Sequence, residues 1–403
     1  MNRLRLASLA LLLACSAQAQ DVLEPVPQMG RYMPLYPGQY VNLAYLRDAR
    51  DSSFDANGQR QESAVPTLDN ASEMPRTDAV ATFTWHFPLF EDYALPFISS
   101  RTWLARVTLR YGDMDTRGAL AAFINDDSDD ADTDADDLRD NGAGVGDLLL
   151  EFGGFLIGSD DWRSGGPRPF AVLLTGGLNV NLGQYDRDAP ISSGTNTPSL
   201  RVHLGTHWAP TASTMIDAGA GLRLFYENQD AAFGALAPDL PGDALVWDLS
   251  ISQRLGSRVF ISAFATGYDG DPNRYDNPRF APNPPEPGTG GDNYPTPGLY
   301  YDNGIQRRSA GLGLEWFASQ NLKLGLHWDH PLSGASGQID LPYTDRNPAG
   351  CTPGSVGCTT TDGDTVRVDG YGHARVFASD RWMLSATYRF GEGDTFTCVG
   401  CEQ

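Results

Sequence analysis

The strongest constraint on the fold is a rhythm in which apolar and polar residues alternate over segments of roughly ten residues. Successive side chains of a β-strand point to opposite faces, so each segment is expected to be a strand with one apolar and one polar face. Leu204 and Leu222, for example, lie on apolar faces, whereas Arg201 and Arg223 lie on polar ones. The expected strands are residues 40–47, 79–87, 103–111, 147–156, 169–182, 200–208, 216–227, 244–254, 258–268, 309–316, 322–329 and 381–390.

Two further features distinguish a membrane barrel from a soluble β-sandwich. Aromatic residues lie at the ends of the apolar faces, where a barrel has its interfacial girdles. They are Trp85, Phe87, Trp103, Tyr111, Trp208, Tyr226, Trp316, Trp328, Trp382 and Phe390. The connections also alternate between long and short, as expected for long external loops and tight periplasmic turns. The sequence therefore predicts an all-β fold, a transmembrane antiparallel up-and-down β-barrel of about 12 strands. Residues 365–377 alternate loosely, so the range is about 10 to 14.

Composition excludes other classes of protein. The mean hydropathy of −0.34 and the lack of a long uncharged apolar run after the start exclude a helical membrane protein. The formal net charge of −22, from 29 Lys+Arg and 51 Asp+Glu, argues against a nucleic-acid partner. The expected partners are outer-membrane lipid, a small-molecule solute and the barrel-assembly machinery.

The N-terminus has the pattern of an export signal, with two arginines, an apolar run and small residues before Ala19. Residues 1–19 are expected to be a cleaved signal peptide, although residues 12–15 also resemble a lipobox that would leave Cys15 lipidated. Residues 20–38 are rich in proline and are expected to form an extended periplasmic leader. The barrel would span residues 39–390 and a Cys-containing tail residues 391–403, in the outer membrane of a Gram-negative bacterium.

Four cysteines remain after cleavage, an even number in an oxidising compartment. Disulfides are the favoured interpretation, and a zinc site is the alternative. The sequence does not decide the pairing among Cys351, Cys358, Cys398 and Cys401.

The densest charge is the acidic run at residues 126–137. Four of its aspartates imitate the first positions of an EF-hand loop, namely Asp130, Asp132, Asp134 and Asp136. The glycine and the bidentate glutamate of that motif are missing, because Ala135 and Asn141 stand in their places. A solvated external loop that collects divalent cations weakly is favoured over a specific calcium site.

Charged residues on the polar faces are candidates for the lumen or its constriction. They are Arg106, Arg110, Asp147, Glu151, Arg201, His203, His207, Arg223, Glu315, His327 and Asp329. As a ring of charges they would select solutes by sign. Alternatively they are ion pairs that fill and stiffen the barrel interior, where unpaired charge is costly.

Enzymatic signatures are missing: there is no G-x-S-x-G, HExxH or P-loop pattern. We expect no enzyme activity and no cofactor. Two alternatives to a channel remain, a structural or adhesive barrel with acidic external binding loops and an outer-membrane hydrolase with a Ser or Asp near a His at the outer rim.

Two short stretches carry a resemblance to a known family. Residues 144–150, with Gly146 and Asp147, resemble its "GxGD" strand start, and residues 174–186, with Gly183 and Tyr185, resemble its "GxYD" segment. The family is the phenol-degradation meta-pathway group of outer-membrane proteins. The resemblance implies a barrel that passes small aromatic or apolar compounds, and it supplies no catalytic residues. The chain departs from the family pattern in the tail that follows Phe390.

Overall fold

The structure is a computed structural model that describes part of the chain. The described residues are 27–28, 31–33, 38–63, 73–89, 102–115, 143–158, 170–185, 194–211, 213–228, 240–272, 274–275, 299–300, 304–341, 366–369 and 376–390. The signal peptide, Cys15, the other four cysteines, the acidic run at 126–137 and the tail at 391–403 lie outside them. Within the described residues, no helix is long and apolar enough to cross a membrane.

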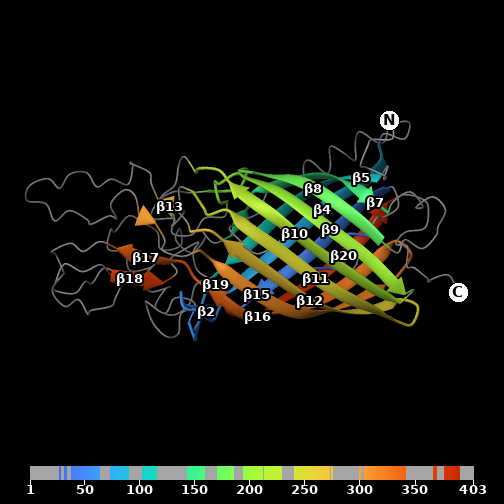
Figure 1. Cartoon of the computed structure of the whole chain (residues 1–403). Helices are drawn as coiled ribbons and strands as arrows, with labels where there is room; N and C mark the ends of the chain where they lie inside the picture. The colour runs from blue at the N-terminus through green and yellow to red at the C-terminus, as the bar shows by residue number, and fades with distance from the viewer. Residues whose placement is uncertain are drawn as a thin grey trace, which may run out of the picture.

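Twelve long strands form one closed antiparallel barrel (Figure 1). They are β1 (Gly38–Asp48), β4 (Arg76–Pro88), β5 (Thr102–Met114), β7 (Leu148–Ile157), β8 (Phe170–Val180), β9 (Ser199–Thr211), β10 (Thr214–Phe225), β11 (Ala244–Leu255), β12 (Val259–Gly270), β15 (Gln306–Phe317), β16 (Leu322–Ala335) and β20 (Arg381–Phe390). Each strand pairs with its neighbours in the chain, and β20 pairs with β1 to close the sheet. The prediction of about 12 antiparallel strands is confirmed.

The remaining strands are short and lie outside the set of twelve. The two-residue β6 (Gly144–Val145) extends the pairing of β5, and β2 (Ser53–Phe54) joins β3 (Arg60–Gln61) and β19 (Val376–Phe377) in a small sheet. Two hairpins, β13 (Arg274–Tyr275) with β14 (Leu299–Tyr300) and β17 (Gln338–Leu341) with β18 (Val366–Asp369), stand beyond the same end of the barrel (Figure 1). Part of the loosely alternating segment 365–377 thus belongs to these small sheets and adds no strand to the barrel wall.

The connections sort by length as expected. At the end where β1 begins and β20 finishes, three turns are as short as residues 212–213, 256–258 and 318–321. The connections at the opposite end include residues 49–75, 115–147, 271–305 and 336–380. Long external loops and short periplasmic turns are the arrangement typical of outer-membrane barrels.

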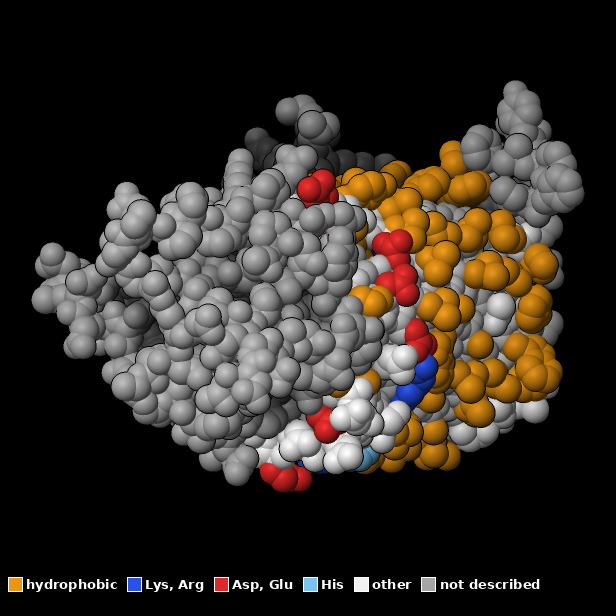
Figure 2. Space-filling model, turned by 60° about the vertical axis from the view of Figure 1, so that its left-hand side comes forward, with side chains coloured by type: hydrophobic (Ala, Val, Ile, Leu, Met, Phe, Trp, Pro, Cys, Tyr) orange, Lys and Arg blue, Asp and Glu red, His pale blue; other side chains and the backbone are white. Residues whose placement is uncertain are grey.

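The faces of the strands also follow the alternation. The apolar residues Leu204 and Leu222 are 45% and 51% exposed on the outside of the barrel, whereas His207 is fully buried inside. Figure 2 shows hydrophobic side chains covering the barrel wall, with charged side chains gathered along one border of this belt. Such a belt matches the hydrocarbon layer of a membrane.

One part of the register differs from the alternation. In β7 the pairing with β8 shifts between Phe155 and Ile157. Phe155 keeps the inward parity of Glu151 and is buried in the lumen, but Ile157, beyond the shift, is 48% exposed, so the apolar face of β7 continues at Ile157 and not at Leu156. A β-bulge inserts one residue and reverses the faces beyond it, and periodicity alone does not reveal where it falls.

Candidate functional site

The barrel lumen is the candidate site, because the inward faces of the strands concentrate the charged residues. Ten of the eleven residues predicted for the lumen lie on strands of the barrel wall, with their side chains on the inner face. The eleventh, Asp147, lies directly before β7 at the external end. The structure distributes these residues over several separate groups.

One of these groups surrounds Asp329 of β16. Its carboxylate is fully buried and lies 3.2 Å from the guanidinium of Arg307 and 2.8 Å from that of Arg381. The partners come from the two strands that flank β16 in the sheet, β15 and β20. Two guanidinium groups on one carboxylate compensate its desolvation, so this cluster fastens three strands together.

Two further groups occupy the periplasmic half of the lumen. Glu315 forms an ion pair with Lys323, with 2.8 Å between Oε2 and Nζ, and its Oε1 lies 3.7 Å from Nε2 of His327. His207 lies 2.9 Å from Asp217, and both side chains are almost fully buried. These contacts join neighbouring strands, β15 with β16 and β9 with β10. They correspond to the ion-pair interpretation of the lumen charges.

On strands β4 and β5, the Asp78 carboxylate forms ion pairs with the guanidinium groups of Arg110, at 2.6 Å, and of Arg76, at 2.9 Å. Arg106 lies 3.1 Å from Glu151 on the neighbouring strand β7. The sequence analysis named Arg110, Arg106 and Glu151 but not Asp78 or Arg76. Both missed residues begin β4, upstream of the segment that showed clear alternation, so the pattern gave no signal for them.

The expected periplasmic leader contributes a segment to the lumen. Of the described part of residues 20–38, Tyr32 and Met33 are buried, at 3% and 7% exposure. The Tyr32 hydroxyl lies 2.6 Å from Nε2 of His203 and donates a hydrogen bond of 2.5 Å to Asp248, while the ring stacks on the imidazole of His203. Residues 31–33 therefore lie inside the barrel and not in the periplasm.

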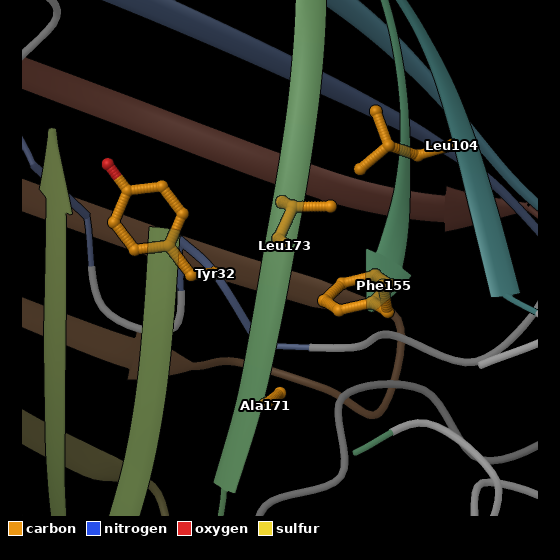
Figure 3. Close-up of a cluster of buried hydrophobic side chains, with 5 residues drawn as sticks. All are labelled: Tyr32, Leu104, Phe155, Ala171 and Leu173. Carbon is orange, nitrogen blue, oxygen red and sulfur yellow. The ribbon is translucent and has the colours of Figure 1, made fainter. Parts of the chain in front are cut away.

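Apolar side chains of the wall hold the Tyr32 ring. Tyr32 belongs to a buried cluster with Leu104, Phe155, Ala171 and Leu173, from strands β5, β7 and β8. Figure 3 shows the tyrosine hydroxyl pointing away from the four other labelled side chains, toward the polar side of the lumen. The residue thus joins the apolar patch on β5, β7 and β8 to His203 on β9 and Asp248 on β11.

Two glycines make room for this ring. A Cβ at Gly205 would lie 2.1 Å from Cδ1 of Tyr32, and one at Gly219 would lie 2.2 Å from its hydroxyl oxygen. Since carbon atoms approach one another to about 3.5–4.0 Å, any larger residue would collide with the ring. Gly205 of β9 and its register partner Gly219 of β10 therefore form a recess for Tyr32.

A cavity lies beside Tyr32 in the middle of the lumen. It holds about 510 Å³ of empty space, part of it open to solvent. Its described lining includes polar and apolar groups from residues 31–32 and from strands β5 and β7 to β11: Arg31, Tyr32, Arg106, Glu151, Leu173, Thr175, Arg201, Val202, His203, Leu222, Arg223 and Val246. Five of the eleven predicted lumen residues meet here, namely Arg106, Glu151, Arg201, His203 and Arg223.

The two stretches that carry the family resemblance meet at the external end. Asp147 accepts hydrogen bonds from the backbone N–H of Gly183 at 3.2 Å and of Thr195 at 3.1 Å, and from the Thr195 hydroxyl. A Cβ on Gly183 would lie 2.6 Å from Cα of Gly194, so the chains approach closely there. Burial raises the pKa of Asp147 above its ordinary value of 3.8, although these hydrogen bonds oppose the shift. The carboxylate fastens the loop after β8 to the start of β7.

The hydrolase alternative predicted a Ser or Asp beside a histidine at the outer rim. The structure contains such a pair, because Nδ1 of His330 lies 2.6 Å from Oδ1 of Asp380. Asp380 also accepts a hydrogen bond of 3.0 Å from the Trp328 indole. Within the described part of the chain, neither ring nitrogen of His330 has a serine or threonine hydroxyl as a partner.

Metal ligation has no support in the described residues, which include no group of three or more His, Cys, Asp or Glu side chains that could hold an ion. His203 and His207 have different partners: His203 contacts the Tyr32 hydroxyl, and His207 contacts the Asp217 carboxylate. The weak calcium candidates and the disulfide candidates are outside the described residues and stay predictions.

Comparison with known families confirms the predicted resemblance. The family described as "Putative MetA-pathway of phenol degradation" matches residues 79–280, which is half of the chain. The chain belongs to this family. The match includes both motif stretches, so the contact of Asp147 with Gly183 gives the likeness to the phenol-degradation family a structural basis.

Among solved structures, the chain is similar to the COG4313 outer membrane channel from Pseudomonas putida F1, with a TM-score of 0.55 and 12% sequence identity, over 91% of this chain and 100% of that one. It is also similar to the NanC porin, with a TM-score of 0.35 and 8% identity, over 86% of this chain and 100% of that one. No curated protein matches the chain. At 12% identity the first likeness establishes the fold, that of an outer-membrane barrel.

Proposed function

We propose that the protein is an outer-membrane channel that passes small organic solutes, aromatic or apolar ones in particular, through its lumen. The observation that carries the proposal is the mid-lumen cavity beside Tyr32. Its described lining combines the apolar side chains of Leu173 and Val246 with polar groups, and sites for small organic molecules likewise combine apolar walls with a few polar groups. The cavity lies inside the closed barrel, between residues 31–32 and strands β5 and β7 to β11.

The composition of the lumen supports an organic solute. The buried cluster with Leu104, Phe155 and Leu173 lines one side of the passage, and a second buried cluster with Met215, Phe260 and Phe317 lies at its periplasmic end. Apolar side chains on an inner wall reduce the cost of transferring an apolar solute from water, by about 25 cal/mol for each Å² buried. A wall made of polar groups alone would offer no such gain.

Membership of the phenol-degradation family supports the same class of solute. The Tyr32 ring would then narrow the passage, because it spans from the apolar cluster to Asp248 on β11. The adhesive alternative depends on the acidic run at 126–137, which is outside the described residues.

The test is the single-channel current of the full-length protein in planar lipid bilayers. We expect ion conductance, and we expect benzamide to interrupt the current at concentrations at which glycerol does not. A folded protein that conducts no ions would refute the channel. Equal interruption by benzamide and glycerol would refute the preference for aromatic solutes and leave a general pore.

A further inference from the structure

One arginine faces outward near the external end of the barrel. Arg47 is the penultimate residue of β1, and its side chain is exposed on the same outer face as Leu43 and Tyr45. Within the described part of the chain, its guanidinium has no ion-pair or hydrogen-bond partner. A charge on the lipid face is costly at the bilayer midplane and much less costly near the interface. Arg47 is therefore expected at the depth of the lipid headgroups.

The register of the sheet places Arg47 at the edge of the apolar belt. Arg47 pairs with Trp382 of β20, and Trp382 pairs with Trp328 of β16. Trp328 in turn pairs with Leu312 of β15, which is 57% exposed in the belt. Because the strands of a barrel are tilted, a row of paired residues changes its height along the axis. Tryptophan side chains collect at the membrane–water interface, so this row passes from the hydrocarbon layer to the headgroups.

Contacts at the outer rim hold the tryptophan rings in place. The rings of Trp328 and Trp382 lie 6.3 Å apart, and the imidazole of His330 stacks on Trp328 at 5.7 Å. The indole N–H of Trp328 donates a hydrogen bond of 3.0 Å to Asp380. Trp382 is 49% exposed. The two rings thus form an ordered aromatic surface beside Arg47.

The described acids on this face do not neutralise Arg47. The Asp380 carboxylate is engaged by His330 and Trp328. Asp113 of β5 belongs to the same row, but Thr77 of β4 stands between it and Arg47. Neighbouring strands are 4.7–4.9 Å apart, so about 10 Å separates the two backbones. The anion available at headgroup depth is phosphate, which a guanidinium binds through two parallel hydrogen bonds.

We propose that Arg47, Trp382 and Trp328 form a docking site for lipid A, with Arg47 bound to a phosphate group and the rings packed against the sugar. The long loops mark this end of the barrel as external. The external leaflet of a Gram-negative outer membrane contains lipid A, a phosphorylated disaccharide with acyl chains. The row offers a matching group for each part of this lipid, since the apolar belt continues below the tryptophans at Leu312. The inference goes beyond the proposed function, because it concerns the outer surface and not the lumen.

The experiment is native mass spectrometry of the full-length folded protein in detergent micelles. The probes are diphosphorylated lipid A and the same lipid after enzymatic removal of its phosphates. We expect the wild type to bind the phosphorylated form more tightly. Arg47→Gln should weaken binding of that form by roughly tenfold, the usual range for a charge-assisted hydrogen bond, and leave the dephosphorylated form unaffected.

Arg258→Gln is the matched control. It makes the same change of charge and length, and Arg258 is exposed in the short turn between β11 and β12 at the periplasmic end. An equal loss of lipid A binding in Arg258→Gln would overturn the inference. Wild-type protein that binds both forms of the lipid equally would also overturn it, and this comparison requires no variant to fold.

Two further probes separate lipid A from other sources of phosphate. Equal affinity for phosphatidylglycerol would show a general attraction to anionic lipid, and displacement of lipid A by millimolar inorganic phosphate would show a site for the free anion. Either result would overturn the assignment to lipid A. The readout is binding at the outer surface, so absence of conductance in bilayers would refute the proposed channel and leave this result standing.

Discussion

Gly205→Ala should displace Tyr32 from the lumen without altering any charge. The new Cβ would lie 2.1 Å from Cδ1 and 2.4 Å from Cε1 of the ring, and the three heavy atoms nearest to it all belong to Tyr32. Carbon atoms need about 3.5–4.0 Å, so the ring would have to move by more than 1 Å. Its hydroxyl would then lose the hydrogen bonds to Asp248 and His203.

The size of the effect follows from those two bonds. A hydrogen bond to a charged group contributes about 1.5–3 kcal/mol and one to a neutral group about 1 kcal/mol, which together give about 2.5–4 kcal/mol. Every 1.4 kcal/mol corresponds to a factor of about ten in an equilibrium, so the docked position of Tyr32 should lose roughly two to three orders of magnitude in population relative to undocked positions.

Single-channel recording in planar bilayers measures the consequence. We expect a larger conductance or a longer open time for Gly205→Ala than for the wild type, and the same direction for Tyr32→Ala. Gly176→Ala on the adjacent strand β8 is the control, because a Cβ there has nothing within 4 Å. Wild-type conductance in both lumen variants, with folding verified by heat-modifiable migration, would refute the argument that Tyr32 narrows the passage.

Three further predictions concern the wall and the rim. Leu222→Arg places a charge on the lipid face and should cost about 2–4 kcal/mol near the midplane, measured as loss of folding into lipid vesicles; normal folding would contradict the topology, and Leu222→Ala is the control. Asp329→Asn leaves Arg307 and Arg381 without their shared carboxylate and should destabilise the barrel by about 3–5 kcal/mol in urea titration, and an unchanged midpoint would contradict the ion-pair reading. Burial raises the pKa of Asp380, but hydrogen bonds from His330 and Trp328 outweigh it and hold the pKa below 3.8. A carboxylate whose pKa is lower in the folded than in the unfolded protein stabilises the fold at pH values above its unfolded pKa. This stabilisation is lost as the pH falls through the folded pKa. The difference in Tm between wild type and Asp380→Asn should therefore be constant at neutral pH, begin to decrease as the pH falls below about 3.8, and disappear below the lowered pKa of the folded protein.

The local pattern of the sequence was sufficient for the wall of the barrel. Each of the twelve expected strands exists, and the outward position of Leu204 and the inward position of Arg201 were both predicted. This succeeds because the direction of a strand side chain depends only on its parity along the chain. The alternation of loop lengths then excluded a sandwich, since a barrel places its long loops at one end.

The tertiary structure alone decided the interior. Register, tilt and bulges determine which inward side chains meet across strands, and none of these is a local property. The bulge beside Phe155 reversed one face, and Asp78 and Asp248 became ion-pair partners although no pattern marked them.

The position of Tyr32 shows the difference most clearly. Its proline-rich surroundings in the sequence predicted an extended leader, and nothing local indicated that it enters the lumen. The reason lies in distant residues: Gly205 and Gly219 leave a recess for the ring, and His203 and Asp248 bind its hydroxyl. The sequence by itself determined a membrane barrel with a charged interior, and the meeting of these distant groups decided where that interior narrows.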